Sequence, residues 1–327
     1  MFRSVFSEEM QAHVESARVE FCKTTYLHKK AALRQFDDYL VSMGLTEKRL
    51  TEEVVNGWIG SLECTARTLC EKVTNVRSFI REMVAFGYRC YLPVSPKYPH
   101  DYVPKIFSDE ELAKITNDAD EFLVTGGKIG APYLRYEYPV ILRLLQCCGM
   151  RLHESISIRV GDVDLGAGVI TLRETKSKRE RLVPLHPKMA DILGKYIRFI
   201  GVGGSGASFL FPGKDAASPL TNGIVAYPFN QSRKRHCLDR EGRSEHGRGA
   251  CIHCLRHTFA FKSFSAAAER GVAVELSAPF LSKYLGHRGL SETEAYLKFS
   301  CDQAPEATAI FESHANDVFP EVDLDEE

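Results

Sequence analysis

The stretch GMRLHESISIRVGDVDL, residues 149–165, decides the fold of the larger part of this chain. The residues before it are mostly apolar, which predicts a buried helix from Pro139 to Cys148. Gly149 is placed to end that helix, and Arg151 lies just past the turn. The sequence therefore places a permanently charged side chain at the end of a buried element.

A hairpin is predicted next, in the segment GVITLRETKSKRERLVPLH, residues 168–186. Its two apolar runs indicate strands at Val169–Arg173 and Arg181–Leu185, joined by a basic turn. Two later stretches, Arg256–Ala268 and Pro279–Leu285, are predicted as helices. This part of the chain is thus expected to be mainly helical with a small β-sheet or hairpin.

The first hundred residues show apolar positions at helical spacing and no alternating strand pattern. Gly44 and Gly87 are placed as helix stops, and Thr51 opens a helix ahead of two acidic residues. We expect a small all-α bundle. Its apolar positions are Leu33, Phe36, Leu40 and Met43, then Val54, Val55, Trp58, Ile59 and Leu62, then Val73, Val76, Phe79, Ile80, Met83 and Val84.

Prolines at positions 93, 96, 99 and 104 separate the two parts. So many prolines do not continue a helix and favour an extended linker. The sequence SDEE, Ser108 to Glu111, forms a capping box that opens the next helix. We therefore predict a multidomain chain with a helical domain at 1–92, a linker at 93–106, a mixed domain at 107–311 and an acidic tail at 312–327.

The composition is that of an ordinary globular protein, with 327 residues, 44% of them hydrophobic and 26% charged. No apolar run approaches the roughly 20 residues of a membrane span. The start, MFRSVFSEEM, lacks the apolar core of a signal peptide, so a cytoplasmic location is expected. The ten cysteines are then expected to be reduced, and Cys147 and Cys148 are predicted core residues.

The charge is unevenly distributed. The net charge of −1 becomes +6 when the seven acidic residues between Glu312 and Glu327 are left out. The segment Arg173–Lys188 holds six Lys or Arg against two Glu, and Arg233–Arg248 holds six against three acids. Nucleic-acid binding requires local basic surface rather than a high overall pI, so the net charge does not exclude it.

Several side chains suited to phosphate chemistry are scattered along the second domain. Arg151 and Arg256 offer planar forks that match two phosphate oxygens and keep their charge. Lys176, in the hairpin turn, is a candidate general acid, and Lys178 competes for that role because spacing alone does not choose between them.

Histidines and a carboxylate accompany these cations. His253, Arg256 and His257 are spaced to share one face of a helix start. His253 and His287 could donate to phosphate oxygens or shuttle a proton. Glu154, three residues after Arg151, could orient that arginine or a histidine through a charge-assisted hydrogen bond.

Tyr296, in EAYLKF, is the candidate nucleophile. A phenol has a pKa of about 10 and needs a nearby base or cations to react. Tyr284, in FLSKYLGH, is the competing tyrosine, and its setting indicates helix packing. Each of these residue types alone is more often structural. Together they predict a metal-free attack on a phosphodiester, with DNA cleavage through a covalent phosphotyrosine.

In their order, these motifs resemble the catalytic domain of the tyrosine recombinase, or phage integrase, family. The resemblance rests on GMRLHESISIRVGDVDL, the hairpin segment, HCLRHTFA and YLGHRGLSETEAY, and extends from about Phe107 to Tyr296. The first hundred residues are similar to the helical core-binding domain of that family only by pattern. The resemblance implies the DNA breaking-rejoining fold.

The resemblance also implies roles. Arg151 and Arg256 would be the catalytic arginines, with Glu154 as acidic partner, Lys176 as general acid and Tyr296 as nucleophile that forms a 3′-phosphotyrosine. His253 would complete an H-x-x-R pair, and His287 would occupy the position of a histidine or tryptophan. The family acts on double-stranded DNA as a tetramer on paired sites, without cofactor or metal. A mobile-element recombinase associated with the nucleoid is therefore expected.

Some alternatives stay open. A type IB topoisomerase-like nicking-closing enzyme would use similar chemistry, and a catalytically silent DNA-binding protein could share the fold. The segment HCLDREGRSEHGRGACIHCLRH is rich in Cys and His, and a zinc site is a weak alternative there, at Cys237, His246, Cys251 and Cys254. Predicted DNA contacts are Arg67, Lys72, Arg77, Lys178, Arg179, Arg233, Lys234 and Arg235.

Overall fold

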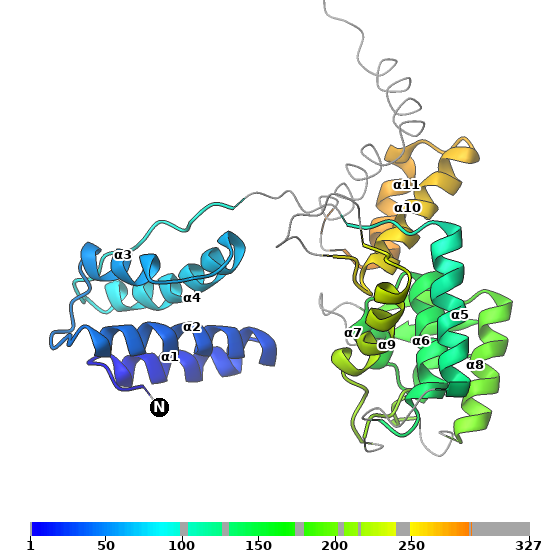
Figure 1. Cartoon of the computed structure of the whole chain (residues 1–327), viewed down its shortest axis with the longest axis horizontal. Helices are drawn as coiled ribbons and strands as arrows, with labels where there is room; N and C mark the ends of the chain where they lie inside the picture. The colour runs from blue at the N-terminus through cyan, green and yellow to red at the C-terminus, as the bar shows by residue number, and fades with distance from the viewer. Residues whose placement is uncertain are drawn as a thin grey trace, which may run out of the picture. The chain divides into compact units, whose positions relative to one another are not determined.

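The structure, a computed structural model, describes residues 2–98, 104–125, 131–173, 180–201, 206–214, 217–239, 249–287 and 289. The chain divides into two compact units, Met1–Asp101 and Tyr102–Glu327, which Figure 1 colours by residue number. The division falls within the predicted linker, 93–106. Each unit has its own hydrophobic core.

The first unit contains four helices: α1 (Ser7–Glu20), α2 (Lys23–Ser42), α3 (Glu52–Gly60) and α4 (Ala66–Ala85). The central contacts are those of α2 with α1 and α4. Phe36 packs edge-on against Trp58, with ring centroids 5.0 Å apart, and both side chains are fully buried. The Thr51 hydroxyl accepts a hydrogen bond from the backbone N–H of Val54, as its predicted capping position requires. The all-α bundle is confirmed.

The periodic pattern of this unit is wrong at two positions. Met43 is 57% exposed and Val84 is 45% exposed, although both fall in the predicted apolar sets. Met43 is the residue that caps the C-terminal end of α2, where the helix leaves the core. Helical spacing identifies the buried face but does not show where along its length the helix loses its partner.

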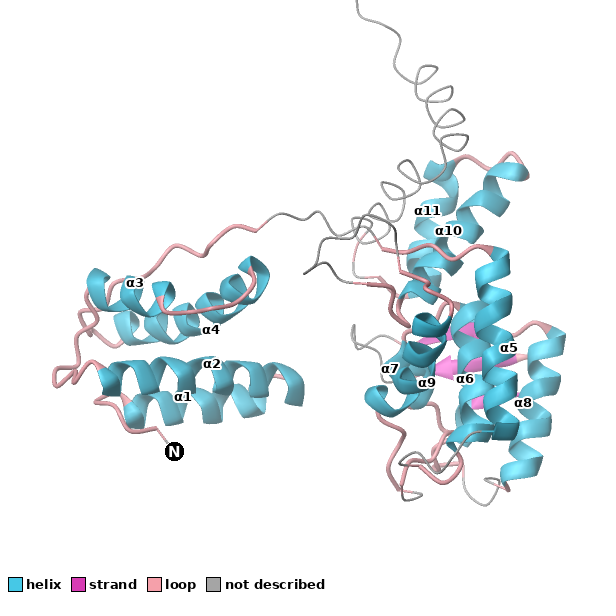
Figure 2. Ribbon diagram, in the orientation of Figure 1, coloured by secondary structure: helices cyan, strands magenta, loops and turns pink. Residues whose placement is uncertain are grey.

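The second unit is built around α6 (Leu134–Cys148), a helix whose buried residues occupy nearly every turn. It packs against α5 (Asp109–Thr125), α8 (Pro187–Ile200) and α10 (Cys254–Glu269). Figure 2 shows these helices around a small sheet. The remaining helices described are α7 (Leu152–Ile156), the 3₁₀ turn η1 (Val160–Asp162), α9 (Asn222–Arg235) and α11 (Val274–Leu285).

The capping predictions for this unit are confirmed. The Ser108 N–H donates to the Glu111 carboxylate, and the Glu111 N–H donates to the Ser108 hydroxyl, which opens α5. Gly149 ends α6 with φ +58°, in the left-handed region that favours glycine. A Cβ on Gly149 would lie 2.3 Å from the ring of Phe259 on α10, so both backbone conformation and space require glycine there.

Three antiparallel strands form the sheet in the order β1 (Val163–Asp164), β2 (Val169–Leu172) and β3 (Arg181–Pro184). In the β2–β3 hairpin, Ile170 pairs with Val183, and Leu172 pairs with Arg181. Ile170, Leu172 and Val183 are buried, so one face of the hairpin packs on the core. The predicted strands are confirmed to within a residue, and so is the mainly helical fold class with its small sheet.

One core prediction is wrong. Cys148 is buried, but Cys147 is exposed. Consecutive residues of a helix point about 100° apart, so an apolar pair at the edge of the buried stripe splits between core and surface. No helix in the described part of the chain is long and apolar enough to cross a lipid bilayer.

A buried carboxylic acid lies in the middle of this core. Glu137 of α6 is fully buried, and neither of its carboxylate oxygens has a hydrogen-bond partner in the described part of the chain. Burial raises the pKa of Glu137 from 4.5 to about 8. The side chain is therefore protonated at neutral pH in the folded protein and ionised in the unfolded chain.

This arrangement predicts a pH-dependent stability. Between pH 4.5 and 8 the folded state holds a proton that the unfolded state releases, so the free energy of unfolding falls as the pH rises through that window. Glu137→Gln removes this loss, which is on the order of 4 kcal/mol over the window. Chemical denaturation at several pH values measures it. Glu269→Gln, at an exposed glutamate, is the control, and equal pH profiles for wild type and Glu137→Gln would contradict the account.

Candidate active site

Arg151 lies between the end of α6 and the start of α7. Its backbone N–H donates to Oε2 of Glu154 at 2.9 Å, and its Nη1 donates to Oε1 of the same carboxylate at 2.9 Å. Glu154 therefore closes the first turn of α7 and holds the guanidinium at the same time. The predicted pairing of Arg151 with Glu154 is present in the structure.

Arg256 is almost completely buried, with 1% of its surface exposed. Its Nη1 donates to the carbonyl of Gly149 at 2.7 Å, and its Nη2 donates to the carbonyl of Leu285 at 2.7 Å. These carbonyls stand at the C-terminal ends of α6 and α11, which carry partial negative charge. Two helix ends thus compensate one buried guanidinium.

The end of α11 also reaches Arg151. Nη1 and Nη2 of Arg151 lie 3.4 Å from the carbonyl oxygen of Gly286, and Nη1 lies 3.5 Å from that of Leu285. Gly286 caps α11 with φ +69°, in the left-handed region that favours glycine. Both predicted arginines therefore meet at one helix terminus, and His287 is the next residue.

His287 is half-buried among cations. Burial, with the nearby charges of Arg256, Arg151 and Arg181, lowers the pKa of His287 to about 3. The imidazole is therefore neutral at physiological pH and can donate from one ring nitrogen and accept at the other. The structure brings His287 together with Arg151 and Arg256, as the sequence predicts.

His253 is the N-cap residue of α10 and is exposed. It lies one turn before Arg256, whose backbone N–H donates to the His253 carbonyl at 3.1 Å. The rings of His253 and His257 meet edge to face with centroids 5.0 Å apart. Burial lowers the pKa of His257 to about 3, with smaller effects of His253, Arg256 and His287. His253 and His257 thus lie together at this helix start, and the role of His253 stays a prediction.

Arg181 belongs to the same cluster but was not among the predicted site residues. Its Nη1 donates to Oε1 of Glu154 at 3.0 Å, and its Nη2 donates to Oε2 at 2.6 Å. Although burial opposes ionisation, the hydrogen bonds and charge of Arg181, with those of Arg151, lower the pKa of Glu154 to about 2. In the sequence, Arg181 is recognisable only as a basic residue at the start of the strand after the turn, and this position alone indicates no more than a basic surface.

Tyr284 packs as predicted. Its hydroxyl donates to the Cys148 carbonyl at 3.1 Å, and its ring stacks on Phe259 with centroids 5.7 Å apart. Burial raises the pKa of the Tyr284 phenol, which opposes its use as a nucleophile. Tyr284 is therefore a structural residue that joins α11 to the end of α6.

Lys176, Lys178, Arg179, His246 and Tyr296 are outside the described residues, as is the segment 312–327. Arg67 pairs with Glu71 at 3.3 Å, and Arg77 donates to the Pro93 carbonyl. Lys72 is half-buried and Lys234 is exposed.

On α9, Arg233 pairs with Asp239 at 2.8 Å. Arg235 pairs with Asp118 at 2.9 Å and with Glu121 at 3.0 Å. These carboxylates neutralise part of the basic charge that the sequence indicates for this segment, so contacts of Arg233 and Arg235 with DNA remain predictions.

The cysteines of the weak zinc alternative are partly placed. The Sγ atoms of Cys251 and Cys254 lie 3.7 Å apart at the start of α10, and the Cys237 thiol lies near the Lys234 carbonyl. Within the described ranges no three His, Cys, Asp or Glu side chains are grouped to hold a metal ion.

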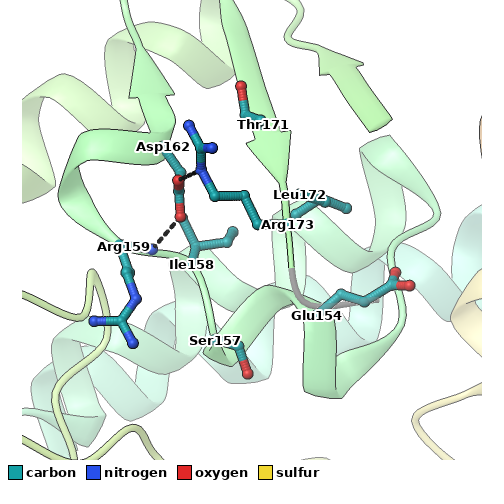
Figure 3. A pocket seen from close by; sticks show the side chains of 8 residues that line it. All are labelled: Glu154, Ser157, Ile158, Arg159, Asp162, Thr171, Leu172 and Arg173. Carbon is teal, nitrogen blue, oxygen red and sulfur yellow. Dashed lines mark hydrogen bonds and ion pairs between the residues drawn. The ribbon is translucent and has the colours of Figure 1, made fainter. Parts of the chain in front are cut away.

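A small pocket lies behind Glu154, between α7, η1 and β2 (Figure 3). Arg173, at the end of β2, donates from Nε to Asp162 at 2.7 Å, and Asp162 in turn accepts from the Arg159 N–H at 3.0 Å. This pair fixes the end of β2 to η1, as Arg181 fixes the start of β3 to α7. Both ends of the hairpin turn are thereby held by ion pairs.

Comparison with known proteins identifies the family of this chain. The family model described as the phage integrase family matches residues 130–301. The chain is 29% identical over 243 residues to a putative integrase/recombinase of Sinorhizobium fredii, covering 71% of this chain and 74% of that protein. It is 27% identical over 312 residues to the tyrosine recombinase XerC of Oceanobacillus iheyensis, covering 90% and 92%.

Solved structures support the same fold. The XerH site-specific recombinase in a post-cleavage complex with its difH substrate matches with a TM-score of 0.65 at 18% identity, covering 93% of this chain and 84% of that one. A lambda integrase tetramer bound to a Holliday junction matches with a TM-score of 0.61 at 16% identity, covering 87% and 78%.

Fold and site thus define an enzyme of the class that transfers DNA strands. The chain belongs to the phage integrase family, the tyrosine recombinases.

The turn at Gly286 gives a direct test of the site's packing. A Cβ there would lie 2.8 Å from Nη1 of Arg181, in addition to the strain of φ +69°. Gly201 caps α8 with the same φ, and an added Cβ meets no described atom within 4 Å. Gly286→Ala should therefore lower the free energy of unfolding by at least about 1 kcal/mol more than Gly201→Ala. Equal losses in denaturant titrations would contradict the packing of Arg181 on Gly286.

Proposed function

We propose that this protein is a site-specific recombinase that cleaves and rejoins duplex DNA through a covalent link between Tyr296 and the 3′ phosphate. The observation that supports this most is the convergence of Arg151 and Arg256 on the end of α11. His287 follows that end directly, and Tyr296 follows His287 by nine residues. In the sequence, the candidate nucleophile therefore follows the cationic site by only a few residues.

The Tyr296 oxygen attacks the scissile phosphorus, and the bond from phosphorus to the 5′ oxygen breaks. The phenol proton passes to His253, because the lowered pKa of His287 makes that imidazole a weak base, and Lys176 protonates the departing 5′ oxygen. Arg151 and Arg256 stabilise the charge that builds on the non-bridging oxygens. The 5′ hydroxyl of a second strand then attacks the phosphotyrosine in the reverse reaction.

The electrostatics of the site support this division of roles. Guanidiniums stay charged at every relevant pH, so the two arginines are suited to charge stabilisation rather than proton transfer. His287, with its pKa lowered to about 3, is neutral and can donate a hydrogen bond to a phosphate oxygen without adding charge. The bond energy is kept in the phosphotyrosine, so we propose no cofactor.

We propose duplex DNA as the partner and a tetramer on paired sites as the active assembly, because XerH is bound to its difH substrate in one similar structure and a lambda integrase tetramer is bound to a Holliday junction in another. We propose that the helical unit, 1–92, and the segment 93–106 also bind the duplex. We further propose that the protein acts in the cytoplasm, at the nucleoid, on a mobile element, since one relative is a putative integrase/recombinase.

The nucleophile is tested with a nicked suicide substrate, which traps the covalent adduct. Tyr296→Phe should bind DNA with wild-type affinity but form no adduct, because the ring lacks the attacking oxygen. Tyr284→Phe is the matched control: it loses one hydrogen bond, about 1 kcal/mol of stability, and should keep the adduct. An adduct in Tyr296→Phe that disappears in Tyr284→Phe would overturn the assignment.

The general acid is tested by a leaving group that needs no proton. Lys176→Ala should cleave an ordinary substrate at least about 100-fold more slowly, and a 5′-bridging phosphorothiolate should restore the rate. Lys178→Ala should behave as wild type on both substrates. Rescue of Lys178→Ala instead would move the role to that lysine.

Paired target sites distinguish recombination from its alternatives. Exchange between two sites on one plasmid supports the proposal. Relaxation of supercoils without exchange would favour the topoisomerase-like enzyme, and binding without cleavage would favour a silent DNA-binding protein.

A further inference from the structure

We propose that Arg181 is a positioning residue for strand cleavage. It holds the carboxylate of Glu154 and thereby sets where Arg151 stands. This inference rests on the proposed cleavage reaction. No atom of Arg181 needs to contact the DNA, because its effect passes through Glu154 and the end of α11.

Arg151 and Arg181 share the one carboxylate of Glu154. Oε1 of Glu154 accepts from Nη1 of Arg151 at 2.9 Å and from Nη1 of Arg181 at 3.0 Å. Oε2 accepts from the Arg151 backbone N–H at 2.9 Å and from Nη2 of Arg181 at 2.6 Å. Each oxygen therefore serves both arginines. Arg181 takes the two-point, fork-like contact, which leaves Arg151 a single side-chain contact.

That division matters for Arg151. With only one bond from its guanidinium to Glu154, Arg151 also reaches the Gly286 carbonyl at 3.4 Å. If Arg181 is lost, the buried carboxylate turns toward Arg151, the nearest remaining cation. The Arg151 guanidinium then moves away from the end of α11, and it no longer stands where it would stabilise charge on the scissile phosphate.

Arg181 also packs against the end of α11. Arg181 packs so closely on Gly286 that a Cβ there would lie 2.8 Å from its Nη1 and 3.2 Å from its Cζ. One side chain thus links β3, α7 and the end of α11, three elements far apart in sequence. Its side chain is 11% exposed and that of Glu154 is 3% exposed, so solvent weakens this pair little.

Arg173 provides a matched comparison on the same hairpin. It also stands beside the turn and also pairs with a carboxylate, Asp162, but it is 55% exposed. Figure 3 shows the Glu154 carboxylate pointing away from the Arg173–Asp162 pair. If the only need were to hold the hairpin in place, Arg173 and Arg181 would matter alike. Because Arg181 bonds Glu154 and Arg173 bonds Asp162 instead, the proposal predicts that the two variants differ.

The experiment compares Arg181→Gln with Arg173→Gln in single-turnover cleavage of the nicked suicide substrate. Arg181→Gln should cleave at least about tenfold more slowly, equal to about 1.4 kcal/mol of activation free energy. Its Kd for uncleaved DNA should stay within about threefold of wild type, because Arg181 contacts no DNA in the proposal. Arg173→Gln should stay within about threefold in both. Equal losses in the two variants would overturn the proposal.

A double-mutant cycle tests the route. If Arg181 acts through Glu154, then Arg181→Gln in a Glu154→Gln background should cause little further loss of cleavage rate. Losses that multiply would show an independent role and contradict the proposal.

The 5′-phosphorothiolate substrate should not rescue Arg181→Gln, since the defect lies at Arg151 rather than in protonation of the leaving oxygen. Rescue would assign Arg181 to the general acid instead.

Arg181→Lys covers the case in which the glutamine variant does not fold. A lysine keeps the charge but makes one contact where arginine makes two, so the cleavage rate should again fall while thermal unfolding stays close to wild type. A wild-type rate in a folded Arg181→Lys would overturn the proposal.

If wild-type protein itself forms no adduct, the proposed function fails. If wild type forms it and Arg181→Gln cleaves like Arg173→Gln, only the role of Arg181 fails.

Discussion

The buried guanidinium of Arg256 is the interaction on which the rest of the site depends. A charge with 1% exposure is costly unless it is fully hydrogen-bonded, and here the C-terminal carbonyls of α6 and α11 accept from it at 2.7 Å each. One of these carbonyls belongs to Gly149 and the other to Leu285, which precedes Gly286, and both glycines have a left-handed backbone conformation. The arginine therefore fixes two helix ends against α10, and it is fixed by them.

The charges around Arg256 are compensated in two different ways. Arg256 is compensated by helix ends, while Arg151 and Arg181 share the one carboxylate of Glu154, whose pKa they lower to about 2. The cluster keeps an excess of positive charge, which suits a phosphodiester and its more highly charged transition state. The same excess, with burial, keeps His287 neutral. One electrostatic environment thus explains both the affinity expected for phosphate and the protonation state of the histidine.

Turn chemistry and hydrophobic periodicity predicted those parts of the site that depend on residues close together in the sequence. The glycine stop before Arg151, the hairpin strands and the helix start at His253 follow from turn chemistry and periodicity, and the structure confirms them. The role of Arg181 could not be found in this way, because its partner lies 27 positions away on another element. The contact between the end of α11 and Arg151 spans 134 positions. Cys147 was misplaced because an apolar neighbour does not show which side of a helix faces the core.

The most direct test of the account is the identity of the residue that becomes attached to DNA. Wild-type protein is trapped on a nicked suicide substrate, digested with nuclease and trypsin, and the phosphate-bearing peptide is sequenced by mass spectrometry. The account predicts attachment through Tyr296, in the peptide spanning residues 289–298. Attachment through any other residue, or DNA that is cleaved without a covalent protein adduct, would contradict it.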